Sequence, residues 1–196
     1  MKDSLLTRHL LRPLEGSRGW QYRPAVQHLL HLVAEVPKPI LAQTRIHTRS
    51  RGRYLPFYSA MRGGGAITLG SRGWQSITFT ENFFSIDQSL YKGRAYGNDV
   101  AGWLDMSAHE AGHLLHAVRF RFFIFYLLVF AYQYLRYGHD AAPLEIEAEA
   151  GRWQYRQFDA YVRQNSSRSL VDLITSDSSE ADKIEQLNAM WGDFRR

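Results

Sequence analysis

Cysteine is absent from the 196 residues of this chain. Its absence excludes disulfide bridges, thiolate catalysis and every metal site built on sulfur ligands, so a bound metal must be held by His, Asp or Glu. Lysine is scarce as well, because only four of the 24 basic residues are lysines. The formal net charge of +5 favours acidic partners only weakly. No recognised nucleic-acid-binding motif accompanies it, so we do not expect a nucleic-acid binder.

Long hydrophobic runs are also missing. The N-terminus lacks the apolar stretch of a secretory signal peptide, since Arg8, His9 and Arg12 interrupt it, and we therefore expect a cytoplasmic protein. One apolar segment, residues 122–135, spans fourteen residues, fewer than the roughly 20 that cross a bilayer. We interpret it as a buried core segment. The alternatives are a peripheral membrane contact through residues 120–135 or a hydrophobic partner site.

The local patterns predict an α+β fold that is mostly helical. Residues 66–69 and 76–80 alternate and contain β-branched side chains, which is typical of a β-hairpin. Apolar stretches, prolines and capping residues predict helices at 24–35, 104–118, 143–164 and 179–191. We expect an N-terminal helical extension over residues 1–58, with Arg or His at every second position from 45 to 53. Residues 59–196 then form one domain that ends in a C-terminal helix.

The residues that indicate chemistry are His109 and His113, with Glu110 between them. Two residues four apart on a helix lie on the same face, so both imidazoles can reach one point, as zinc requires of two ligands. Glu110 is placed to deprotonate a zinc-bound water. Gly112 lies within the same helix, where glycine costs about 1 kcal/mol of helix propensity. We therefore expect it to admit the close approach of another segment.

A catalytic zinc takes a third protein ligand and leaves one position for water. Residues 143–150 open a later helix and contain three carboxylates. We predict Glu145 as the ligand, with Glu149 on the same face accepting the other ring N–H of a ligand histidine. Glu149 and Glu147 remain alternative ligands. If taken alone, the three acids would merely favour a helix N-terminus.

Three further side chains lie near these positions in the sequence. His116 shares part of the face of His113, and we expect a packed or supporting histidine there rather than a metal ligand. Tyr137 and His139 shortly precede the carboxylates. Either can stabilise an oxyanion, and the alternative is an aromatic packing residue and a loop histidine.

Residues 107–117 and 143–150 together resemble the gluzincin metallopeptidases, most closely the small bacterial and phage-type members. Glu145, Ala148 and Glu149 match the family's glutamate element, in which Glu149 replaces the usual Asp or Asn. The chain is also similar to the minimal metallopeptidase-like domain associated with contractile injection systems, which has a glycine-rich hairpin before the zinc helix and an aromatic run after it. The resemblance covers residues 64–165.

The resemblance implies a minimal zincin-like domain that holds one Zn²⁺ per chain. Its ligands would be His109, His113 and Glu145, and Glu110 would be the general base. The expected activity is that of a zinc metalloendopeptidase acting on a peptide or protein. Two alternatives stay open: a non-catalytic zinc-binding assembly or toxin-associated module, and a membrane-associated peptidase that uses residues 120–135.

Overall fold

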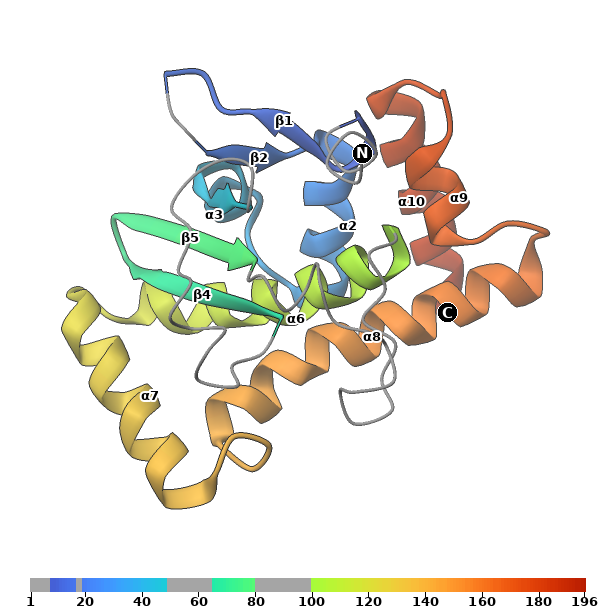
Figure 1. Cartoon of the computed structure of the whole chain (residues 1–196). Helices are drawn as coiled ribbons and strands as arrows, with labels where there is room; N and C mark the ends of the chain where they lie inside the picture. The colour runs from blue at the N-terminus through green and yellow to red at the C-terminus, as the bar shows by residue number, and fades with distance from the viewer. Residues whose placement is uncertain (1–7, 17–18, 49–64, 80–99) are drawn as a thin grey trace.

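The computed structural model describes residues 8–16, 19–48, 65–79 and 100–196. Within them the fold is α+β and mostly helical, which confirms the predicted class (Figure 1). The strands are β1 (Leu11–Pro13), β2 (Trp20–Tyr22), β3 (Arg45–His47), β4 (Ala66–Ser71) and β5 (Trp74–Phe79). The helices are α2 (Pro24–Ala34), α3 (Lys38–Gln43), α6 (Val100–Arg119), α7 (Phe123–Tyr137), α8 (Pro143–Asn165), α9 (Leu170–Thr175) and α10 (Glu180–Phe194).

The five strands form one mixed sheet in the order β1-β2-β3-β5-β4. Only β3 and β5 are parallel; the other neighbours are antiparallel. The predicted hairpin is confirmed, although its strands extend further than expected, to Ser71 and Trp74, which face each other across a two-residue turn. This arrangement places β4 at one edge of the sheet, where it packs against α6 and α7.

Elements from both parts of the chain share this sheet and one hydrophobic core. Buried side chains of α2 pack with those of α6, α8 and α10, and Trp103 of α6 stacks on Phe79 of β5 with ring centroids 3.8 Å apart. The expected boundary near residue 58 lies outside the described residues. Most of the predicted basic strip also lies outside the described residues. Of its five members, only Arg45 and His47 are described, and both lie on β3.

Helix α2 depends on the far end of the chain for its N-terminal cap. It begins at Pro24 without any side-chain cap of its own. Instead, the carboxylate of Glu180 accepts a hydrogen bond from the Ala25 amide at 2.7 Å. His28 of the same helix contacts the Asn188 side chain at 2.7 Å. Helix α10 itself begins with a capping box at Ser179, as its sequence predicted.

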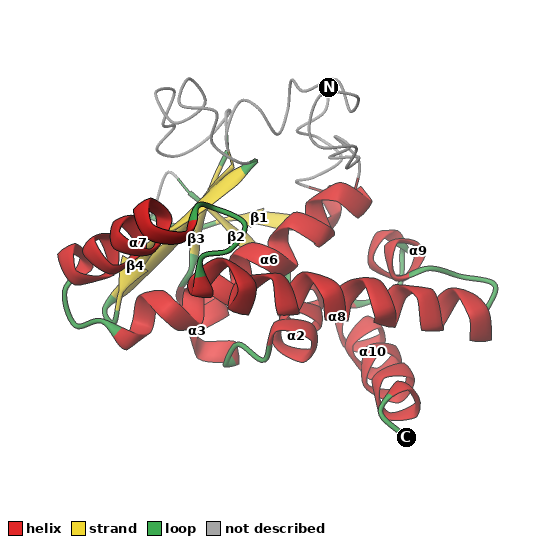
Figure 2. Ribbon diagram, turned by 90° about the horizontal axis from the view of Figure 1, so that it is seen from below, coloured by secondary structure: helices red, strands yellow, loops and turns green. Residues whose placement is uncertain are grey.

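The apolar segment predicted to be buried is instead the largely exposed helix α7. Of its 15 residues only Tyr126 is buried. The helix contacts β4 on one side (Figure 2). Most of its large apolar side chains are exposed. The prediction was wrong because hydrophobicity along a segment does not indicate which neighbour covers it. None of the described helices is long and apolar enough to cross a membrane.

Candidate metal centre

The centre is built where α6 and α8 approach most closely. A Cβ atom added at Gly112 of α6 would lie 2.7 Å from the Cα atom of Ala148, and one added at Gly151 of α8 would lie 2.7 Å from the Ala108 carbonyl oxygen. Only glycine therefore fits these two positions without displacement of backbone. The expected role of Gly112 is confirmed, and the contact places Glu145, one turn before Ala148 along α8, beside the histidines of α6.

His109, His113 and Glu145 form a buried cluster whose donor atoms all lie within 4.8 Å of one another. The Glu145 Oε2 atom lies 3.4 Å from the Nε2 atoms of both histidines. Donor atoms about 2.1 Å from a tetrahedral zinc lie about 3.4 Å apart. This Oε2 is buried and accepts no hydrogen bond from any described residue. Two imidazoles and an unsatisfied carboxylate oxygen are a donor set that fits a metal cation.

Charge within the cluster shifts the pKa values of its members. Burial by itself lowers the pKa of His109, but the carboxylates of Glu145 and Glu149 outweigh burial and raise this pKa to about 9. Burial likewise raises the pKa of Glu145, but His109 and His113 lower it well below the usual range. The carboxylate is therefore ionised at neutral pH, while a cation that binds His109 must displace a proton.

Glu149 contacts the ring nitrogen of His109 that faces away from Glu145. The His109 Nδ1 and Glu149 Oε2 atoms are 3.1 Å apart. Arg152 donates to the same oxygen at 2.6 Å and also pairs with Asp105 at 3.2 Å. The structure thus brings Glu149 to the position where it can orient His109, and Arg152 and Asp105 extend that support. The sequence did not indicate this supporting role for either of these two residues.

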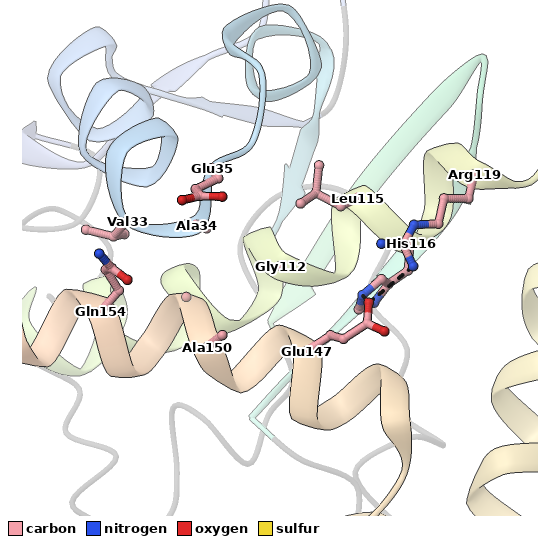
Figure 3. Close-up of a pocket in the computed structure, with 11 residues that line it drawn as sticks. Val33, Ala34, Glu35, Gly112, Leu115, His116, Arg119, Glu147, Ala150 and Gln154 are labelled. Carbon is pink, nitrogen blue, oxygen red and sulfur yellow. Dashed lines mark hydrogen bonds and ion pairs between the residues drawn. The ribbon is translucent and has the colours of Figure 1, made fainter.

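His113 has a separate support. Its Nδ1 atom lies 3.3 Å from Nδ1 of the buried His116, whose Nε2 contacts Glu147 at 2.9 Å (Figure 3). Arg119 donates to the same Glu147 oxygen at 3.1 Å. Burial, with help from His113, lowers the pKa of His116 to about 4, so its ring is neutral at pH 7. A neutral His116 that donates to Glu147 can accept from His113, which leaves the His113 Nε2 lone pair directed at the cluster.

The three carboxylates of α8 differ in which of these side chains they contact. Glu147 faces His116 and Arg119, half exposed, and it lies outside the group whose donor atoms converge. Glu145 alone of the three belongs to that group, and Glu149 contacts His109 from the other ring nitrogen. Spacing along the helix left all three open, because it does not reveal how α8 is rotated against α6.

Glu110 is buried and is held from the sheet. The Thr68 hydroxyl, on β4, lies 2.7 Å from the Glu110 Oε2 atom and 3.0 Å from its carbonyl oxygen. The Tyr126 hydroxyl of α7 in turn lies 3.4 Å from the Thr68 carbonyl oxygen. The carboxylate next to the first histidine is therefore fixed by an edge strand. Sequence reasoning missed Thr68, since a threonine in an alternating strand carries no signal of its own.

The two candidate oxyanion residues differ in their placement. His139 lies in the loop after α7, and its Nε2 atom is 3.7 Å from Glu145 Oε2, while its Nδ1 contacts Asp140 at 3.2 Å. Tyr137 is half exposed, and its hydroxyl accepts a hydrogen bond from Arg136 at 3.2 Å. Within the described part of the chain no contact joins Tyr137 to the cluster. The structure therefore brings His139 to the centre and leaves Tyr137 at the surface.

A pocket of about 250 Å³ lies on the other side of the same helix pair, between α2, α6 and α8 (Figure 3). His116, Arg119 and Glu147 border it, together with Glu35 and Gln154. The three cluster residues are not among its lining, so this pocket meets the residues that support His113 rather than the centre itself.

Comparison with protein-family models, with curated proteins and with solved structures finds no match for this chain. The geometry of the site is therefore the evidence for its function. That geometry is a His-His-Glu cluster on two helices, with an adjacent carboxylate held by a strand.

Proposed function

We propose that the protein is a zinc-dependent metallopeptidase of the zincin type. One observation carries the proposal: a buried, unsatisfied oxygen of Glu145 lies 3.4 Å from the Nε2 atoms of both His109 and His113. The spacing agrees with a tetrahedral zinc and three protein ligands, which leaves one position for water or substrate. The presence of Glu110 beside His109 favours a catalytic over a purely structural site, because a structural site does not use a general base.

When bound, zinc would polarise the scissile carbonyl and lower the pKa of its water. Glu110 accepts the proton of the attacking water on its carboxylate and later passes that proton to the leaving amine. The Thr68 hydroxyl keeps this carboxylate in place during both transfers. His139, at the solvent-exposed side of Glu145, donates to the oxygen that becomes negatively charged.

The substrate in this proposal is an extended peptide. β4 is an edge strand, and its residue Thr68 contacts the catalytic carboxylate. A peptide that pairs with the part of this edge that Tyr126 of α7 does not occupy would gain main-chain hydrogen bonds while its scissile bond lies close to Glu110. The geometry therefore favours hydrolysis within an extended chain.

The metal part of the proposal is tested by zinc content. The protein is purified in metal-free buffers, reconstituted with zinc and measured by mass spectrometry beside His113→Ala and Glu145→Ala. We expect about one zinc per wild-type chain and loss of zinc in both variants. Glu185→Ala, an exposed glutamate on α10, is the matched control and should retain the metal. Wild-type protein that binds no zinc after reconstitution would rule the peptidase out.

The catalytic part is tested by Glu110→Gln. This variant should retain zinc and fold while it loses cleavage of an unfolded protein substrate, because only the proton acceptor has been removed. The outcome that contradicts the peptidase is a wild-type protein that binds zinc but cleaves no more of a broad set of peptides than Glu110→Gln does. That result would favour the non-catalytic assembly module.

A further inference from the structure

Helix α7 presents an apolar stripe to solvent. The stripe consists of Ile124, Leu128, Tyr132 and Leu135, which recur at the spacing that places side chains on one helix face. The first three are 56 to 59% exposed and Leu135 is 86% exposed. The neighbouring Phe122 and Phe125 are also exposed by more than half. An exposed apolar surface this continuous is typical of an interaction site.

The opposite side of α7 fixes it to the fold. Tyr126 is buried and contacts the carbonyl oxygen of Thr68, and Phe123 packs on Trp74 with ring centroids 5.4 Å apart. Trp74 lies at the hairpin end and is itself 47% exposed. The stripe is therefore displayed by a fixed helix at the periphery of the molecule, on the side of β4 (Figures 1 and 2).

The charged side chains on α7 and in the segment before it have one sign. No Asp or Glu occurs from residue 111 to residue 139. Arg121 precedes α7 and Arg136 lies in its last turn; their guanidinium groups lie 5.4 and 5.5 Å from the ring centroids of Phe122 and Tyr137. Arg72, at the hairpin turn, is exposed nearby, and its amide donates to the Phe120 carbonyl oxygen. Apolar and aromatic side chains flanked by arginines suit the boundary between lipid headgroups and acyl chains.

We propose that the stripe of α7 docks in the plane of an anionic lipid membrane. A helix of 15 residues is about 22 Å long, and it is not among helices able to span a bilayer. It would therefore lie in the interface, with its apolar side chains among the acyl chains and its arginines at the headgroups. A second copy of the chain is a poorer occupant, because pairing two α7 helices, neither of which contains Asp or Glu, brings arginines of like charge together.

Docking in this way would bring the metal centre to the membrane surface. α7 leads directly to the loop of His139, and the Gln133 side chain of α7 accepts a hydrogen bond from the Leu144 amide at the start of α8. The substrates would then be polypeptide segments that emerge from the bilayer. This last step, unlike membrane docking itself, rests on the proposed peptidase function.

The test is co-sedimentation with vesicles of phosphatidylglycerol and phosphatidylcholine, beside vesicles of phosphatidylcholine alone. Leu128→Ser combined with Leu135→Ser should weaken binding to the anionic vesicles about tenfold or more, because two apolar side chains no longer enter the bilayer. Trp153→Ser is the matched control: Trp153 is 61% exposed, but it lies on α8, and its loss should leave binding unchanged. Arg121→Gln and Arg136→Gln should each weaken binding about 5-fold on anionic vesicles only.

The proposal is overturned if wild-type protein does not sediment with anionic vesicles, or if the double leucine variant binds them as wild type does. Light scattering tests the other occupant, a second copy of the chain. If wild-type protein dimerises but does not bind vesicles, and the double leucine variant is monomeric, the stripe is a dimer interface instead. Zinc content measured on the same preparations separates this outcome from the peptidase proposal, because vesicle binding can fail in a protein that retains zinc and persist in one that binds none.

Discussion

Replacing Gly112 with alanine should weaken metal binding about tenfold or more while the protein still folds. The new Cβ would lie 2.7 Å from the Cα atom of Ala148, about 0.7 Å inside the 3.4 Å at which ordinary van der Waals contact begins. The obstacle is backbone, so α8 must shift against α6 by a similar distance. Metal sites tolerate ligand displacements of only about 0.2 Å. Because Glu145 is on α8 and both histidines are on α6, we expect zinc affinity to fall about tenfold or more.

The free energy of unfolding should change by a modest amount. Crowding a packed interface costs about 1–3 kcal/mol, whereas alanine in place of glycine within a helix contributes about 1 kcal/mol of stability. The net destabilisation of the metal-free protein is then between about 0 and 2 kcal/mol. A loss of zinc affinity of about tenfold or more, in a variant whose metal-free form still unfolds cooperatively in urea, would show that the contact sets ligand geometry in addition to supporting the fold.

The assay is competition with a chromophoric zinc chelator, beside urea denaturation of the metal-free protein. Gly192→Ala is the matched control, since Gly192 also lies within a helix, α10, but a Cβ atom there meets nothing within 4 Å. It should be more stable by about 1 kcal/mol and bind zinc as the wild type does. The reasoning is refuted if Gly112→Ala binds zinc with wild-type affinity.

Three further predictions concern the residues around the cluster. Glu147→Gln should lower zinc affinity about tenfold, because it weakens the support of His113, and unchanged affinity in the chelator assay would contradict this. Thr68→Val should lower the free energy of unfolding in urea by about 1.5–3 kcal/mol, because Glu110 loses its hydrogen-bond partner. The same variant should retain zinc but cleave peptides more slowly. Cleavage at the wild-type rate would disprove the role assigned to Thr68. The raised pKa of His109 stabilises the metal-free protein below about pH 6.5, and this contribution is lost as the pH rises through about 9. The melting temperature without zinc should therefore fall across that interval, and a flat profile would argue against the buried imidazolium.

The cluster was predictable from the sequence to the extent that it is local. His109 and His113 share a face because they lie one helical turn apart, whatever the rest of the chain does. Glu145 required a further assumption, that its helix packs on theirs, and the glycines within the two helices, Gly112 and Gly151, are the local signs of that contact. Thr68 and Glu147 acquire their contacts from the placement of β4 and from the rotation of α8, neither of which is encoded in a short segment.

The fold shows the same division. The hairpin and helices α2, α6, α8 and α10 follow from alternation, prolines and capping residues, whereas helices α3 and α9 were not predicted. The parallel pairing of β3 with β5 does not follow from such patterns, because its two strands are separated by many residues and no turn specifies their register. Exposure of α7 was missed for a related reason: an apolar run predicts that a segment avoids water, and it leaves open whether protein or another phase replaces that water.

The cap that Glu180 provides to α2 has a consequence for the order of folding during synthesis. The Ala25 amide lacks this partner until residue 180 has left the ribosome. Helix α8, on which α2 packs, is likewise translated more than a hundred residues after it. Helix α2 therefore gains its N-terminal cap only after most of the described residues have been synthesised, although its own residues are among the earliest of them.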